Sequence, residues 1–72
     1  MGLYEYKMLS EEDQWIHLWA NGVHLEIMAF IDNNFTLYAL HMFFVEVEVS
    51  NDNKIVGKKE FKKGYLLEKW AI

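Results

Sequence analysis

Three histidines are the residues of this sequence best suited to bind a metal ion or to move a proton. Imidazole is a common ligand of transition metals, and Glu26 or Glu46 could complete a site. The expected positions keep the rings apart, because His17 lies on the polar side of a helix, His24 begins a strand and His41 lies near a chain break. We therefore predict isolated or hydrogen-bonded histidines, with no metal site and no cofactor.

The hydroxyl, thiol and carboxylate groups do not form a catalytic set. The chain has no cysteine, and its two serines, Ser10 and Ser50, are expected at a helix N-terminus and in a turn rather than on a nucleophile elbow. Glu46 and Glu48 share one face of a strand, as a glycosidase pair would. Lysines expected on the next strand would keep both carboxylates ionised, which makes them poor general acids. We predict that the protein is not an enzyme and has no catalytic or cofactor-binding residue.

Charge is distributed unevenly along the chain, whose net charge is -4. Residues 1–53 carry nine acidic residues and one lysine, whereas residues 54–72 carry six lysines and two acidic residues. We interpret this asymmetry as ion pairing across a folded sheet. Every basic residue is a lysine, so nucleic-acid binding, which favours the bidentate contacts of arginine, is not expected. The acidic residues Glu11, Glu12 and Asp13 leave open an acidic inhibitor, of the phage or mobile-element type, that occupies a basic surface of a larger protein.

Hydrophobic periodicity predicts the first elements of secondary structure. Ser10 is a good N-cap for a helix that runs to Ala20, and Asn21-Gly22 predicts a left-handed C-terminal stop. Residues 3–8 alternate loosely, so they form either a short strand or an extension of that helix. A period of two over residues 23–31 predicts a strand with Val23, Leu25, Ile27, Ala29 and Ile31 on one face.

Residues 35–49 are extended in character and form the most apolar part of the chain. Fifteen residues exceed the usual strand length of about five or six, so we expect a bulge or break near His41 and Met42. One helix can cover only one face of a sheet, so either a C-terminal helix or another chain must cover the second face. Both faces are expected to be apolar: Leu37, Ala39, Phe43 and Val45 on one, and Tyr38, Leu40, Met42 and Phe44 on the other.

The last third of the chain predicts a hairpin followed by a helix. Residues 50–53 are rich in turn-forming side chains and close a hairpin onto a strand at residues 54–61. Apolar residues at helical spacing predict a short helix over residues 64–72. The predicted fold is one α+β domain, residues 1–72, in which a small antiparallel β-sheet of three to four strands packs against an N-terminal helix and a short C-terminal helix. Strand pairing would place Glu46 and Glu48 within reach of Lys58 or Lys59.

The sequence LYALHMFFVEV at residues 37–47, followed by residues 54–56, Phe61 and Leu66-Leu67, resembles small uncharacterised bacterial proteins. The positions that carry this resemblance are aromatic and aliphatic residues at sheet spacing, over roughly half of the chain. The resemblance therefore implies a fold and brings no activity with it.

The surplus of apolar side chains favours a small acidic protein that binds another protein or associates with itself, with a homodimer as the expected form. We expect the interface to use residues from this set: Trp15, Trp19, Tyr38, Leu40, Met42, Phe44 and Trp70. The alternative role of each tryptophan is to fill the core. A third hypothesis is a small apolar ligand in a pocket formed by Trp15, Trp19, Tyr38 and Phe44. We expect no membrane segment and no signal peptide, and a chain without cysteine suits a cytoplasmic location.

Overall fold

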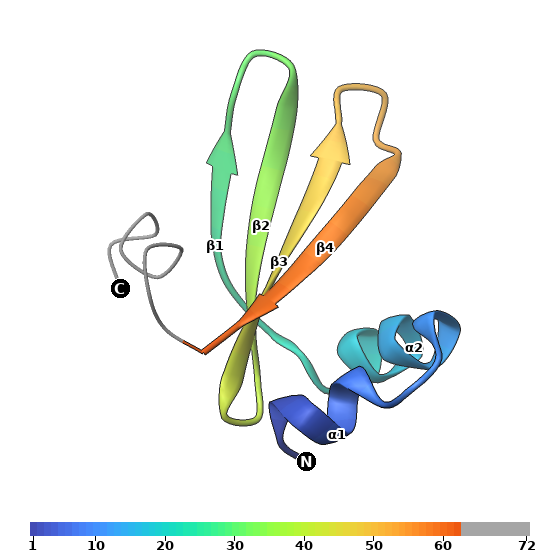
Figure 1. Ribbon diagram of the computed structural model, residues 1–72. Coiled ribbons are helices and arrows are strands. Elements are labelled where there is room, and N and C mark those ends of the chain that lie inside the picture. Colours follow the sequence, from blue (N-terminus) through green and yellow to red (C-terminus); the bar gives the residue numbers. More distant parts are fainter. Residues whose placement is uncertain (63–72) are drawn as a thin grey trace.

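The computed structural model describes residues 1–62 as two helices and a four-stranded antiparallel sheet (Figure 1). The strands form a meander in the order β1-β2-β3-β4, so each strand pairs with its neighbour in sequence. The α+β class and the antiparallel sheet are thus confirmed, whereas the helix predicted over residues 64–72 lies outside the described residues. Neither described helix is long and apolar enough to cross a membrane. The elements are α1 (Leu3–Lys7), α2 (Glu11–Asn21), β1 (Val23–Ala29), β2 (Asn33–Leu40), β3 (Phe43–Ser50) and β4 (Ile55–Phe61).

Helix α1 is a separate short helix rather than a strand or an extension of α2. It ends at Lys7, with Met8 as its C-cap, and residues 8–10 separate it from the first turn of α2. The ring of Tyr6 is fully buried and packs against Phe43, with 5.2 Å between ring centroids. The short helix therefore places one large aromatic side chain in the core, an interaction that its own sequence pattern does not predict.

Helix α2 begins as predicted, but its C-terminal end has a different conformation. The Ser10 hydroxyl accepts a hydrogen bond from the Asp13 amide at 3.2 Å, which caps the helix. Gly22 follows the last helical residue with φ -70° and ψ 143°, which is extended backbone, so the predicted left-handed stop is wrong. Glycine is needed there because an added Cβ would lie 2.6 Å from the carbonyl oxygen of Leu18. The same oxygen accepts a hydrogen bond from the Gly22 amide at 2.7 Å.

A two-residue turn at His41 and Met42 joins β2 to β3, which confirms the predicted break. Residues directly opposite each other in an antiparallel pair share a face, and Leu40 lies opposite Phe43. An uninterrupted strand would instead place these two side chains on opposite faces. The predicted faces are therefore wrong beyond the turn: Tyr38, Leu40, Phe43 and Val45 share the face toward the helices, called the helix face, whereas Leu37, Ala39 and Phe44 share the other, called the far face.

Strand β1 departs from the predicted alternation in the same way. It ends at Ala29 rather than at residue 31, and a bulge at Leu25 shifts its register between His24 and Glu26. Val23 pairs with Ala39 on the far face, whereas Ile27 pairs with Thr36 on the helix face, so the single apolar face predicted for residues 23–31 is wrong.

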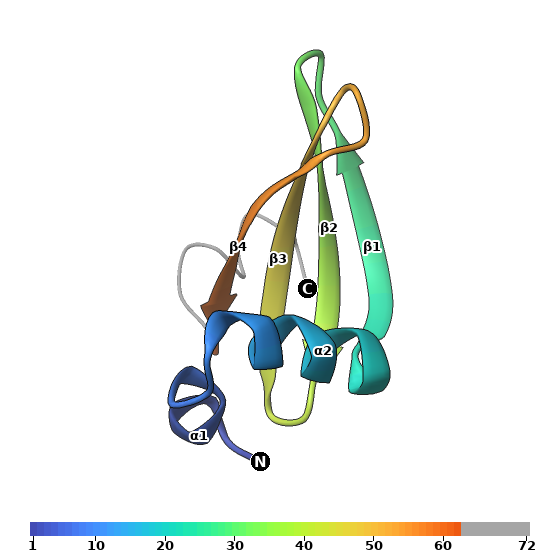
Figure 2. The ribbon, with the colours of Figure 1, turned by 90° about the vertical axis from the view of Figure 1, so that its right-hand side faces the viewer.

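The main core lies between the helices and the helix face, near the β2–β3 turn. Figure 2 shows α2 crossing the sheet at this end, while the β1–β2 and β3–β4 hairpins extend well beyond it. A second cluster on the far face contains buried Leu37 and Phe61, with Met28, Phe35 and Phe44 packed around them. Each fully buried large apolar side chain contributes about 1.5–3 kcal/mol relative to exposure. The buried residues of the main core are Tyr6, Leu18, Leu40, Phe43, Val45 and Val47.

Candidate functional site

Lys58 and Glu60 form an enclosed ion pair at the sheet–helix interface. Their side chains are 6% and 14% exposed, and Lys58 Nζ lies 2.6 Å from Glu60 Oε2. The same ammonium donates to Gln14 Oε1 and lies 5.2 Å from the centre of the Tyr6 ring. The ammonium is thus held between a carboxylate, an amide oxygen and aromatic rings, which take up its hydrogen bonds and shield it from water. This charge pair is a structural element of the core boundary.

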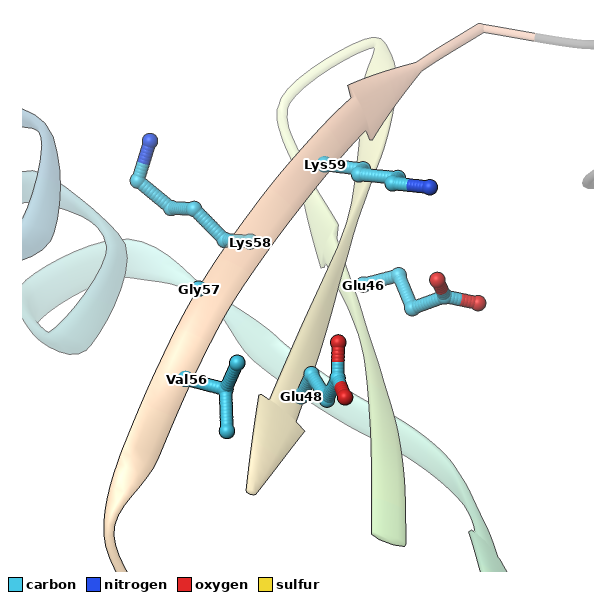
Figure 3. Close-up of a pocket in the computed structure, with 6 residues that line it drawn as sticks. All are labelled: Glu46, Glu48, Val56, Gly57, Lys58 and Lys59. Carbon is cyan, nitrogen blue, oxygen red and sulfur yellow. The ribbon is translucent and has the colours of Figure 1, made fainter. Parts of the chain in front are cut away.

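The position of Lys58 corrects the predicted cross-strand pairing. Lys58 lies opposite Val47, so its side chain points to the helix face and away from Glu46 and Glu48 (Figure 3). Lys59, the neighbouring residue, lies opposite Glu46 on the far face, as predicted. The alternation of strand side chains makes only one of the two lysines available to the glutamates.

A shallow hollow lies between β3 and β4. Its volume of about 170 Å³ is below the range of about 300–1,000 Å³ typical of small-molecule sites. Glu48 accepts a hydrogen bond from the Asn33 side-chain amide, and Gly57, opposite Glu48, leaves open space in place of a side chain. The hollow is thus too small and too charged for an apolar ligand. It is lined by Glu46, Glu48, Val56, Gly57, Lys58 and Lys59 (Figure 3).

Two of the three histidines meet at the junction of α2 and the β2–β3 turn. His17 Nε2 lies 2.8 Å from His41 Nε2, which is a hydrogen-bond distance. On its other side, His17 contacts the side-chain amide of Asn21, which lies 3.4 Å from His17 Nδ1 and donates to the His17 carbonyl oxygen at 3.1 Å. The expected separation of the rings is not observed for this pair, but its hydrogen bond agrees with the prediction of isolated or hydrogen-bonded histidines. His24 stays separate, with its ring edge against Tyr38.

His41 has an unusual backbone conformation and a perturbed charge state. Its φ of 56° lies in the left-handed region, which is unfavourable for most residues with a side chain, although histidine is among those enriched there. Partial desolvation, followed by the positive charge of the N-terminus and by His17, lowers the pKa of His41. The ring is thereby favoured in its neutral form, in which a nitrogen lone pair is available.

The predicted interface residues do not form one surface. Trp15 and Trp19 stack at 5.5 Å between ring centroids on the helix face, and Trp19 meets Tyr38 edge-on at 5.6 Å. Phe44 lies on the far face, stacked on Phe61, so the aromatic pocket predicted from Trp15, Trp19, Tyr38 and Phe44 does not form. Leu40 is buried in the core, Met42 is exposed in the turn, and Trp70 lies outside the described residues.

A further group of exposed apolar side chains lies on both faces of β1 and in the loop after it. Val23, Leu25 and Ile27 are exposed along this strand, and Phe30 and Ile31 follow at the hairpin tip. The alternating pattern of residues 23–31 indicated a strand, but it could not indicate that the strand lies at the sheet edge. Edge position depends on strand order, which is a property of the tertiary fold.

No family model matches the chain, and neither a curated protein nor a solved structure is significantly similar to it. The fold defines the class only as an α+β domain with a four-stranded antiparallel meander preceded by two helices. The resemblance to small bacterial proteins stays a prediction.

Proposed function

We propose that the protein is a self-associating protein-binding module, and that β1 pairs with β1 of a second copy. The observation that carries the proposal is the exposure of an apolar edge strand: Val23 is 61%, Leu25 43% and Ile27 57% exposed. Within residues 1–62, β1 has a strand neighbour on one side only, so its other side offers unpaired amide and carbonyl groups. Such an edge is a template for strand addition.

The two edges of the sheet differ in a way that favours β1 as the contact. Strand β4, at the opposite edge, carries exposed Lys59 beside the enclosed pair Lys58 and Glu60, and an exposed charge on an edge strand opposes strand addition. Strand β1 carries one acidic residue, Glu26, and one histidine among its seven residues. A second copy would therefore meet little charge at β1 and more at β4.

The bulge at Leu25 limits regular pairing to the second half of the strand, Glu26 to Ala29. An isologous antiparallel contact with Ile27 opposite the partner's Ile27 also sets Glu26 opposite the partner's Met28. This register keeps the two Glu26 carboxylates apart and joins apolar side chains on the helix face. Phe30 and Ile31, exposed beside the paired segment, extend the buried apolar area.

The hairpin tips are positioned as one unit, which makes this end of the sheet a defined surface. The Asn51 side-chain amide donates to the carbonyl oxygen of Ile31 at 2.9 Å, which joins the β3–β4 tip to the β1–β2 tip. The ring of Phe30 packs edge-on against Phe35, with 5.6 Å between centroids. The exposed apolar residues beyond the helices are therefore held in place before any partner arrives, which lowers the entropic cost of association.

Light scattering coupled to size exclusion tests this proposal. We expect a wild-type dimer that dissociates on dilution, and a monomer for Ile27→Lys. The matched control is Val56→Lys, which places the same charge at a residue that is 60% exposed on β4. Circular dichroism verifies that both variants are folded. A wild-type chain that is monomeric at high concentration would refute the proposal, and so would equal loss of the dimer in both variants.

A further inference from the structure

We propose that His17 and His41 form a binding site for a divalent transition-metal ion that prefers imidazole ligands. This inference does not depend on self-association, because both ligands belong to one chain. It is carried by the approach of two ring nitrogens, Nε2 to Nε2, at 2.8 Å from elements that are far apart in sequence. Neither the helical pattern around His17 nor the turn at His41 requires this contact.

The distance between the nitrogens is close to that of two cis ligands of one ion. Metal–imidazole bonds of about 2.0–2.1 Å, with ligand–metal–ligand angles between those of octahedral and tetrahedral ions, place the two nitrogens about 2.9–3.4 Å apart. The observed 2.8 Å needs an increase of only a few tenths of an ångström. The rings now face each other nearly head-on, with centroids 5.0 Å apart, so each ring must also tilt toward the ion. His41 is exposed, which leaves room for this tilt.

The surroundings of His17 orient it as a ligand. Its ring is half-buried beside Tyr6, with 6.2 Å between centroids, and the Asn21 side-chain amide contacts Nδ1. Metal binding through Nε2 leaves the ring proton on Nδ1, so the Asn21 side-chain amide must turn to present its oxygen to that N–H. Bound metal would replace the proton that the two Nε2 atoms now share.

The two-residue turn fixes the position of the His41 side chain. Such a turn requires a positive φ at its first position, and His41 adopts a φ of 56° although glycine or asparagine would do so more easily.

The site provides two protein ligands, which sets its expected strength. In residues 1–62 no group of three or more His, Asp, Glu or Cys residues could hold a metal, so water completes the coordination. The expected ligand is therefore a reversibly bound ion. Among first-row ions the affinity should be greatest for Cu²⁺, lower for Ni²⁺ and Zn²⁺, and negligible for Mg²⁺, which prefers oxygen ligands.

Calorimetric titration and thermal unfolding of the full chain with Cu²⁺, Ni²⁺, Zn²⁺ and Mg²⁺ test the site. We expect one ion per chain, and a Tm increase of roughly 5–10 °C at a free metal concentration about ten times Kd. His17→Gln and His41→Gln should each abolish both effects. His24→Gln is the matched control, because it removes the histidine outside the pair, and it should leave binding unchanged.

Two outcomes would overturn the inference. One is equal loss of binding in His24→Gln and in the two pair variants, and the other is binding that persists when His17 or His41 is replaced. The titration is repeated in the monomeric Ile27→Lys chain, where binding should persist. Loss of binding there would show that the ligands come from two copies and would overturn a site within one chain, while leaving the dimer proposal intact.

Discussion

Replacing Lys58 with methionine should destabilise the protein by leaving Glu60 as an unpaired charge beneath α2. Lys58 Nζ lies 2.6 Å from Glu60 Oε2, and both side chains are largely shielded from water. Removal of one partner of a buried pair costs about 3–5 kcal/mol. Because Glu60 keeps some exposure, we expect the lower end, about 3 kcal/mol. For a domain of this size that loss lowers Tm by roughly 12 °C or more.

Urea denaturation followed by tryptophan fluorescence measures this change, and two further variants separate its causes. Lys58→Met combined with Glu60→Leu removes both charges, and we expect it to lie within about 1 kcal/mol of the wild type, because an apolar pair of similar volume replaces the ions. Lys54→Met is the matched surface control. Its partner Asp52 is 3.7 Å away and both side chains are exposed, so it should change stability by no more than about 0.5 kcal/mol.

The reasoning fails if Lys58→Met costs no more than Lys54→Met. It also fails if the double variant is as unstable as Lys58→Met alone, because the loss would then come from the lysine's packing against Tyr6 and Trp15 rather than from an unpaired carboxylate.

Three further predictions concern single residues. His41→Gly should raise the free energy of unfolding by about 0.5–1 kcal/mol, because it relieves the left-handed φ; a loss of stability in urea denaturation would contradict this. Burial, followed by the charges of Glu60 and Glu11, raises the pKa of Tyr6. The folded state therefore holds this proton more tightly, and stability should fall as pH rises above about 10, less steeply in Tyr6→Phe, as measured by urea denaturation across alkaline pH. Gly22→Ala should lower stability by about 1–3 kcal/mol through the clash with the Leu18 carbonyl, whereas Gly57→Ala, with no atom within 4 Å of an added Cβ, should not; equal thermal shifts would refute this reason.

Local spacing was sufficient wherever one element decides the outcome. Ser10 predicted the start of α2, because a hydroxyl three residues before an amide in a helix is enough to cap it. The length and composition of residues 35–49 predicted a break at His41 and Met42. The α+β class followed from a segment with helical hydrophobic periodicity and later segments with the periodicity of strands.

Only the tertiary structure decided which side chains meet. A turn or a bulge reverses which alternate residues point to a given face of the sheet. The faces of Phe43, Phe44 and Ile27 could therefore be assigned only from the observed register. The contact between His17 and His41 and the enclosure of Lys58 arise where α2 crosses the sheet, between residues 24 or more positions apart. Hydrophobic periodicity constrains only residues that are close together within one helix or strand. These contacts are set by the packing of helices against strands, which depends on side chains from the whole chain.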